Sequence, residues 1–320
     1  MALTGGSGVV GSAVLRHLVA AGEQVRALAR SSSSAGAVAA RGATAVSGDI
    51  LDHQALIETF SGCDLVYHVA GVNEMCSRNP ERMYRVNVDG SRAVLRACAA
   101  AGVKRLVYTS SAVTIGEPAG VIATEKTTHR GSYLSAYERS KHHAERAVLS
   151  ETTPVEVVTV NPSSVQGPGR SSGTGEIILR VLSGRLPVLV ESTVSIVDID
   201  DCARGHLLAG QNGSPGERYL LSGFTTSVSA AVSLAAEALG REVDVKLLPT
   251  WLAGLGAAAV EAGARLRRQR PRLCREMIRV VAHGHSYDGS RATRELGLEY
   301  TAPDETLRRL VEWFVAEDLL

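Results

Sequence analysis

The sequence has 320 residues, of which 45% are hydrophobic and 21% are charged, and its 34 Lys+Arg nearly balance its 33 Asp+Glu. This composition is typical of a soluble globular protein and excludes a disordered chain. A net charge of +1 argues against nucleic acid as the main partner, because phosphate binding needs a surplus of Lys and Arg.

The cysteines and the N-terminus bear on the compartment. The five cysteines are scattered and form no CxxC pair, so the sequence predicts neither a disulfide framework nor a zinc cluster. No basic segment precedes the first apolar stretch, which argues against a signal peptide. No apolar run reaches the ~20 residues that a membrane-spanning helix needs. We therefore expect a cytoplasmic protein without a membrane span.

The first half of the chain alternates short apolar strands with Ala-rich helices. This alternation predicts a parallel sheet covered on both faces. Right-handed crossovers would make it an α/β fold with a Rossmann-type, doubly wound sheet. The predicted strands are 2–4, 24–29, 44–47, 65–69, 105–109 and 156–161, and the predicted helices are 11–21, 51–60, 83–101 and 133–151.

The alternation loosens after Pro162. Residues 163–174 form a loop rich in Ser, Gly and Pro, whereas 194–222 reads again as strand, helix and strand. We expect a Rossmann domain over 1–162, rejoined by 194–224, and a smaller, interleaved substrate-binding lobe over 163–320. Further helices are predicted at 175–183, 227–240, 251–268, 272–282 and, in large part, 290–320.

A glycine-rich turn, TGGSGVVG at 4–11, lies between the first strand and the first helix. The GxGxxG spacing gains meaning from this context, because it starts a βαβ unit. Gly5, Gly8 and Gly11 permit a tight turn and let backbone N–H groups approach a pyrophosphate at the helix N-terminus. The turn therefore predicts a dinucleotide site.

The end of the second strand selects the cofactor. A carboxylate about 20 residues beyond the glycines selects NAD, and an Arg there accommodates the 2′-phosphate of NADP. Arg30 stands at this position, and no acidic residue lies between Glu23 and Asp49. One charge-assisted hydrogen bond to phosphate is worth roughly 1.5–3 kcal/mol. We predict NADP (NADPH) over NAD; a solvated surface role for Arg30 is the alternative.

Tyr137 and Lys141 form a Tyr-xxx-Lys pair on a predicted helix, where this spacing places both side chains on one face. An ammonium ~4–5 Å from the phenol favours phenolate by roughly 3–4 kcal/mol at an effective dielectric constant of ~20, and so should lower the pKa of Tyr137. Ser111 follows the fifth strand, at the carboxyl edge where such sheets bind ligands. Its hydroxyl can hydrogen-bond a carbonyl that receives hydride.

Together these residues resemble the extended branch of the short-chain dehydrogenase/reductase superfamily, also described as the NAD-dependent epimerase/dehydratase family. The resemblance covers nearly the whole chain, and 217–223 and 294–298 are most similar to the dihydroflavonol-reductase and hopanoid-associated epimerase-like group. Further matching motifs are Asp49-Ile50, HVAG at 68–71, NVDG at 87–90 and NPSSVQGP at 161–168, where Asn161 replaces a frequent Arg.

The resemblance implies specific roles. Ser111, Tyr137 and Lys141 would form the catalytic triad, with Tyr137 as the proton donor to a carbonyl. Substrate contacts are expected at Asn73, Cys76, Ser111, Val113, Tyr137 and Ser163, with a plain loop position as the alternative for Cys76. Cofactor contacts are expected at Gly5, Gly8, Val9, Val10, Gly11, Arg30, Asp49, Ile50, Val69, Ala70, Gly71, Asn87, Thr109, Lys141, Asn161, Pro162, Ser164 and Val165.

The leading hypothesis is NADPH-dependent reduction of a small-molecule ketone or aldehyde. A dehydratase is disfavoured because the strand end 109–111 has no carboxylate, and loss of water needs an acid and a base. An NAD(P)-dependent sugar-nucleotide epimerase is the alternative, although 191–196 lacks the Arg that commonly binds the diphosphate. A cofactor-binding protein without turnover is a third possibility, disfavoured by the intact triad.

Other features suggest no metal site. The pairs His142-His143 and His283-Gly-His285 are interpreted as surface or packing residues. We expect a monomer or a homodimer. Arginines follow the apolar segment 251–264; packing within the lobe is favoured for this segment, with membrane-surface or carrier-protein docking as the alternative. They are Arg265, Arg267, Arg268, Arg270, Arg272, Arg275 and Arg279.

Overall fold

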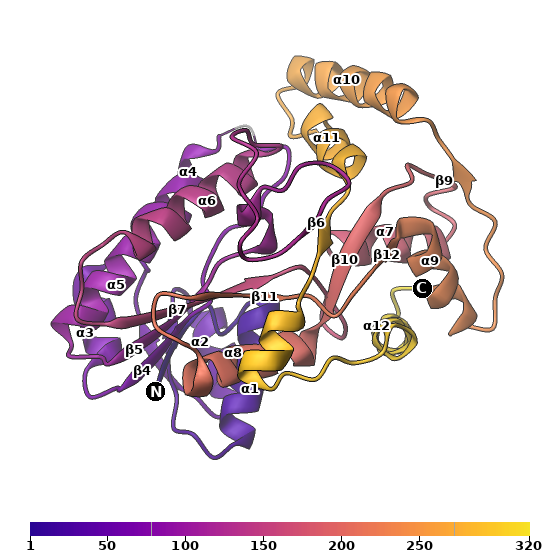
Figure 1. Cartoon of the computed structure of the whole chain (residues 1–320). Coiled ribbons are helices and arrows are strands. Elements are labelled where there is room, and N and C mark those ends of the chain that lie inside the picture. The colour runs from indigo at the N-terminus through magenta and orange to yellow at the C-terminus, as the bar shows by residue number, and fades with distance from the viewer. Residues whose placement is uncertain (78, 272) are drawn as a thin grey trace.

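The computed structural model describes residues 1–77, 79–271 and 273–320. Within these residues, seven parallel strands form a central sheet in the order β11-β7-β5-β4-β1-β2-β3 (Figure 1). The strand order reverses direction at β1, which confirms the predicted Rossmann-type, doubly wound sheet. The strands are β1 (Ala2–Thr4), β2 (Arg26–Ala29), β3 (Thr44–Ser47), β4 (Leu65–His68), β5 (Arg105–Thr109), β7 (Glu156–Pro162) and β11 (Arg218–Leu221).

Helices cover both faces of this sheet. Val107 packs into the core formed with α1, α2 and α8, whereas its neighbours Leu106 and Tyr108 pack into the core formed with α3, α5 and α6. Burial on both faces explains why the strands are continuous apolar runs. The helices are α1 (Val9–Ala20), α2 (Ser32–Ala39), α3 (His53–Phe60), α5 (Gly90–Ala100), α6 (Ala136–Leu149) and α8 (Ile199–Asn212).

Two helical segments differ from the sequence prediction. Helix α2 was not predicted, and it begins at a capping box in which Ser31 and Ser34 each bind the other's backbone N–H. The helix predicted over 83–101 is divided into α4 (Glu81–Tyr84), a π-helical turn (Arg85–Asp89) and α5. Short π-helical turns inside helices are frequent at functional sites, and this one carries Asn87.

The lobe has its own small sheet, in the order β12-β10-β8. Within 194–224, β11 belongs to the main sheet, whereas the strand at the start of this range, β10, belongs to the small sheet. Ile196 of β10 pairs with Ser164 of β8 and with Phe224 of β12, because the chain has already left the main sheet after Pro162. These strands are β8 (Ser164–Gln166), β10 (Thr193–Asp198) and β12 (Phe224–Ser227).

Some helices of the lobe pack around this small sheet, and others lie farther from it (Figure 1). A third apolar core joins α7 (Thr174–Leu182), α9 (Val228–Glu237) and α12 (Pro303–Ala316). α10 (Thr250–Leu266) lies outside that core and packs on α11 (Arg275–His283). Two short pairings interleave distant segments: β6 (Ile122–Ala123) with β14 (Ser286–Tyr287), and β9 (Val188–Leu189) with β13 (Lys246–Leu247).

Two of the five cysteines form a disulfide, which corrects the prediction of no disulfide. Cys76 in the loop after β4 is bonded to Cys274, which directly precedes α11, 198 residues later. Only the folding of the lobe brings these positions together, so no local spacing signalled the bond. Because structural disulfides are rare in the cytosol, the bond does not fit the reducing setting expected from the sequence. Cys63, Cys98 and Cys202 are buried thiols.

Candidate active site

The turn between β1 and α1 requires glycine at both ends. Gly5 has φ +77°, and a Cβ there would lie 2.6 Å from the backbone nitrogen of Ala70. A Cβ at Gly11 would lie 2.0 Å from the carbonyl oxygen of Gly5. Helix α1 begins after Gly8 with no side-chain cap and no acidic residue in its first turn. Its first N–H groups, starting at Val9, are therefore available to an anion such as pyrophosphate.

The predicted ribose-phosphate end lies at β2 and β3. Arg30 is exposed directly after β2 and precedes the N-terminus of α2, so a cation, serine hydroxyls and a helix N-terminus share one edge. Asp49 follows β3, and its carboxylate accepts a hydrogen bond from the Leu51 backbone at 3.0 Å. Ile50 is buried, and a Cβ at Gly90 would lie 3.1 Å from its side chain. No carboxylate stands between β2 and α2 to select a free 2′-hydroxyl.

The segment after β4 is fixed from two sides. The Val69 backbone N–H bonds the Thr4 carbonyl at 3.2 Å, and the Ala70 N–H donates to the Thr4 hydroxyl at 3.3 Å. Asn87 accepts from the Val72 N–H at 2.8 Å and donates to the Val72 carbonyl and the Ser140 hydroxyl, each at 2.9 Å. The Asn87 side chain therefore holds the segment after β4 against α6.

The structure brings the three predicted catalytic residues together at the carboxyl edge of the sheet. Ser111 follows β5, and Tyr137 and Lys141 lie one turn apart near the start of α6. The Ser111 hydroxyl is within hydrogen-bonding reach of Tyr137. Lys141 is buried and donates to the Thr109 carbonyl at 2.8 Å. Burial lowers the pKa of Lys141 to about 8, and the Glu145 carboxylate opposes this decrease.

The pKa of Tyr137 differs from the expectation. Burial raises it above its usual value, while the hydrogen bond from Ser111 and the charge of Arg170 act in the opposite direction. The ammonium of Lys141, which should have lowered this pKa, is directed at the Thr109 carbonyl. Arg170 is therefore the cation that acts on the phenol, and only its place in the loop 163–174 marked it in the sequence.

Buried hydrogen bonds hold the strand end that carries Ser111 of the triad. Asn161 donates to the Ser111 carbonyl at 3.2 Å, to the Thr114 hydroxyl at 3.0 Å and to the Glu145 carboxylate at 2.7 Å. The Thr109 hydroxyl pairs with His206 at 2.9 Å. Asn161 and Thr109, both predicted cofactor contacts, thus have side chains engaged with the protein, and their role is to hold the strand end that carries Ser111.

The remaining predicted residues surround this edge. Pro162 and Val165 are buried, and the Ser164 hydroxyl pairs with Thr174 at 3.0 Å. Asn73 is exposed and Val113 is half-buried. Among the described residues, the buried Ser163 hydroxyl has no hydrogen-bond partner. The predicted substrate residue Cys76 is 7% exposed and its sulfur is in the disulfide, so it is not a free thiol.

Glu276 is a site residue that the sequence did not reveal. Its carboxylate accepts from the backbone N–H of Ala136 at 2.6 Å and from that of Cys76 at 2.9 Å. Ala136 directly precedes Tyr137, so α11 of the lobe is tied to the start of the catalytic helix. No local motif marks Glu276, because both of its partners are distant along the chain.

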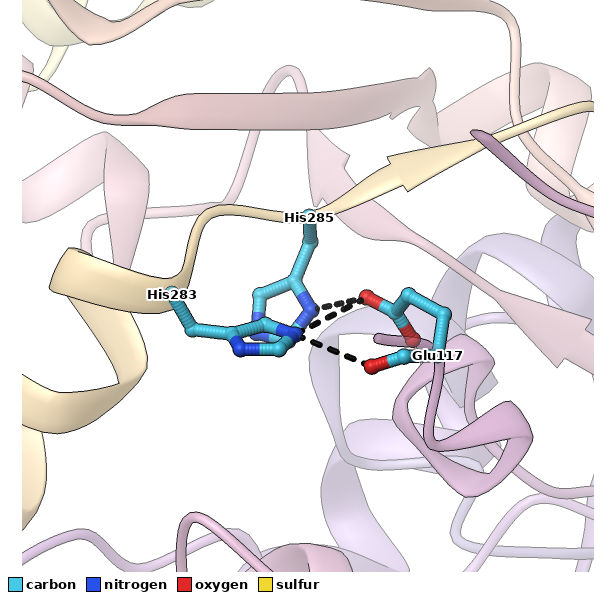
Figure 2. Close-up of side chains that lie close together, drawn as sticks. All are labelled: Glu117, His283 and His285. Atoms are coloured by element: carbon cyan, nitrogen blue, oxygen red, sulfur yellow. Dashed lines mark hydrogen bonds and ion pairs between the residues drawn. The ribbon is translucent and has the colours of Figure 1, made fainter. Parts of the chain in front are cut away.

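A second bridge joins the two halves through Glu117, His283 and His285 (Figure 2). His285 Nδ1 lies 2.6 Å from Glu117 Oε1, and His283 Nε2 lies 3.1 Å from the Glu117 carbonyl oxygen. Arg130 donates to the same carbonyl at 3.1 Å and pairs with Glu138, the residue after Tyr137. Two ligands of one zinc ion would be separated by ~3.3 Å, given bonds of ~2.0–2.1 Å. The 2.6 Å between His285 and Glu117 is shorter than this separation, so the cluster is a hydrogen-bonded bridge.

A groove of about 960 Å³ lies between the 76–77 segment, α10 and α11. Its lining combines the apolar side chains of Trp251, Leu255 and Ile278 with the charged side chains of Glu276 and Arg279. Because Glu276 also binds the N–H beside Tyr137, the groove lies next to the catalytic helix.

These features fit a nicotinamide dinucleotide. The glycine turn leaves the first N–H groups of α1 open. A Cβ at Gly71 would lie 3.9 Å from Lys141 Nζ, so the segment after β4 and the Lys141 ammonium lie at the same edge of the sheet. A Rossmann sheet binds its dinucleotide at this edge, outside the carboxyl ends of the strands.

Comparisons with known proteins agree with this assignment. A protein of Synechocystis sp. whose name is that of a dihydroflavonol 4-reductase is 33% identical over 98% of this chain and 93% of its own length. The sterol demethylase protein B of Methylococcus capsulatus is 30% identical over 98% of this chain and 97% of its own. A UDP-glucose 4-epimerase of Streptomyces lividans is 30% identical over 77% and 83%. The crystal structure of gox2253 superposes with a TM-score of 0.85 at 30% identity, covering 100% of this chain and 98% of that chain.

The family described as "NAD dependent epimerase/dehydratase family" matches residues 1–222, which span the glycine turn, the triad and β11. The chain therefore belongs to this family, the extended branch of the short-chain dehydrogenases/reductases, and it is an oxidoreductase with a nicotinamide cofactor site.

Proposed function

We propose that the protein is an NADPH-dependent carbonyl reductase that acts on a small apolar ketone or aldehyde. The observation that carries this proposal is the assembly of Ser111, Tyr137 and Lys141 at one sheet edge, with no carboxylate at the strand end that could serve a dehydration. The apolar substrate class is supported by the groove side chains Trp251 and Leu255. Two relatives are also named for the reduction of dihydroflavonol and the demethylation of sterol.

The reduced cofactor, when bound, supplies the hydride. Tyr137 donates its proton to the substrate oxygen as that oxygen gains negative charge, and the Ser111 hydroxyl donates a hydrogen bond to the same oxygen. Lys141, beside Gly71, would hold the ribose hydroxyls. With a pKa of about 8, its ammonium is largely charged at neutral pH and remains hydrogen-bonded to the Thr109 carbonyl. Arg170 supplies the positive charge that stabilises the phenolate left on Tyr137.

NADP over NAD is supported by the exposed Arg30 and the serines of α2 after β2. A guanidinium and hydroxyl groups suit a 2′-phosphate, whereas NAD selection uses a carboxylate at this point.

A sugar-nucleotide epimerase is the second candidate. It is supported by the epimerase relative and by Arg170, a cation near Tyr137 that could bind a diphosphate. Glu191 and Ser192, which precede β10, supply no such cation.

The test is NADPH oxidation by purified protein with a panel of cyclic and long-chain ketones, and in parallel with UDP-sugars. The proposal expects net oxidation with ketones, because epimerisation returns the hydride and consumes no NADPH. Tyr137→Phe should reduce turnover by about 10²–10⁴-fold while keeping cofactor affinity, since it removes only the general acid. Tyr133→Phe is the matched control and should retain turnover. Sugar epimerisation without NADPH consumption would refute the reductase assignment.

A further inference from the structure

Helix α10 exposes an apolar face to solvent. Trp251, Leu255 and Leu266 have exposed fractions of 66%, 63% and 87%. Their spacing of four and eleven residues places them on one side of the helix. The buried residues of α10 are the small Ala253 and Ala257, which lie on another side. The helix is therefore inverted relative to an ordinary surface helix, whose apolar side faces the core.

The polar side of α10 faces its neighbour α11. Glu261 is the one charged residue between 250 and 264, and its carboxylate pairs with Arg265 and Arg275. Figure 1 shows α10 at the outer end of the lobe, with α11 between it and the rest of the molecule. An exposed apolar stripe of this size marks an interaction surface.

Positive charge flanks the stripe. The sequence from 265 to 279 holds seven arginines and one acidic residue. Arg272 lies outside the described residues, and the one acid, Glu276, is engaged by the N–H groups of Ala136 and Cys76. Exposed arginines in this stretch include Arg265, Arg267, Arg270, Arg275 and Arg279. An apolar face bordered by arginines complements the headgroup region of a bilayer that contains anionic lipid.

We propose that α10 and these arginines form a docking surface for an anionic lipid bilayer, with α10 lying in the plane of the headgroups. A second copy of the chain is a poorer occupant, because a two-fold contact would bring two arginine clusters together. The helix lies on the bilayer rather than through it: none of the helices in the described ranges is long and apolar enough to cross a membrane.

The surface borders the groove described above. Trp251 and Leu255 belong to both, so a docked molecule would open this groove toward the bilayer. An apolar ketone dissolved in lipid could then enter this groove, whose lining residue Glu276 binds the start of the catalytic helix, without crossing water. This last step rests on the proposed function, whereas bilayer docking does not.

The experiment uses Trp251 as its own reporter. The sequence has two tryptophans, so Trp313→Phe in the full chain leaves Trp251 alone. This protein is titrated with phosphatidylcholine vesicles that contain or lack phosphatidylglycerol. We expect a blue shift of Trp251 emission and co-sedimentation with the anionic vesicles only, both weakened by salt. No binding, or equal binding to both vesicles, overturns the proposal.

Matched variants separate the apolar from the charged contribution. Leu255→Ser should weaken vesicle binding, whereas Val315→Ser, an exposed valine on α12 (55% exposed), should not. The double variant Arg267→Glu/Arg279→Glu should bind anionic vesicles at least about tenfold more weakly. The control Arg241→Glu/Arg294→Glu, outside the cluster, should bind them as wild type does. If the proposal holds, the protein does not self-associate through this face. If it self-associates without lipid, and Leu255→Ser abolishes that self-association, the face binds a second copy and the proposal is overturned. Because these readouts measure binding, they stand whether or not ketone reduction is found.

Discussion

The cofactor side and the substrate side of the active site are held by different kinds of contact. On the cofactor side, the glycine turn, Asn87 and Lys141 lie at the ends of sheet strands or on the helices that cover them. On the substrate side, the contacts join distant segments: Cys76 with Cys274, Glu276 with Ala136, and His285 with Glu117, separated by 198, 140 and 168 residues. Loss of the lobe contacts should therefore leave NADPH affinity unchanged, whereas it should lower kcat/KM for the ketone.

The largest expected effect is on the disulfide. Cys274→Ser should lower the free energy of unfolding by about 2–4 kcal/mol, because the bond constrains a long segment of the unfolded chain. NADPH affinity should stay unchanged, since the glycine turn does not depend on this bond. Thermal melts with and without reductant measure the effect: reductant should destabilise wild type and leave the variant unaffected. A wild-type melt that is insensitive to reductant would contradict the bond.

Arg30 tests the cofactor side alone. Arg30→Ala should remove roughly 1.5–3 kcal/mol of NADPH binding through the lost phosphate contact, with NADH binding and KM for the ketone unchanged. Arg41→Ala, an exposed arginine between α2 and β3, is the control. Fluorescence titration with both nucleotides gives the answer, and wild-type protein that binds NADH as tightly as NADPH would refute the assignment.

Glu276 tests the substrate side. Glu276→Ala removes two hydrogen bonds between α11 and the start of the catalytic helix, and should lower kcat/KM by about tenfold, mostly through KM. The exposed Glu242→Ala is the control. A fall in NADPH affinity as large as the fall in kcat/KM would show that cofactor binding also depends on Glu276. It would contradict the separation of the cofactor side from the substrate side.

The smallest effect concerns pH. Arg170 lowers the pKa of Tyr137, so Arg170→Met should raise it. Tyr137 must be protonated to act as the acid, and the rate is lost as pH rises through its pKa. The basic limb of the kcat profile should therefore move to higher pH by less than about one unit. Arg185→Met is the control, and a limb that moves down would contradict the role of Arg170.

The sequence predicted the cofactor half in detail. Six strands of the main sheet appear where apolar runs placed them, and Ser111, Tyr137 and Lys141 converge as their positions at β5 and α6 required. These features are local: a strand, a turn and a helix each carry their own pattern, and parallel strands bring their carboxyl ends to one edge. The serine run of α2 was missed because its capping box is made of serines, which are more common in loops.

The contacts of the substrate half could not be predicted without the folded chain. The fold class, the dinucleotide turn and the triad could be predicted from the residues alone, because each depends on residues within one or two adjacent elements. The partnership of Cys76 with Cys274, the bridging role of Glu276, the cation at Arg170 and the outward apolar face of α10 each depend on where distant segments meet. A helical pattern shows that α10 has an apolar side, but which side faces solvent is set by the position of α11, and that position is a property of the folded chain.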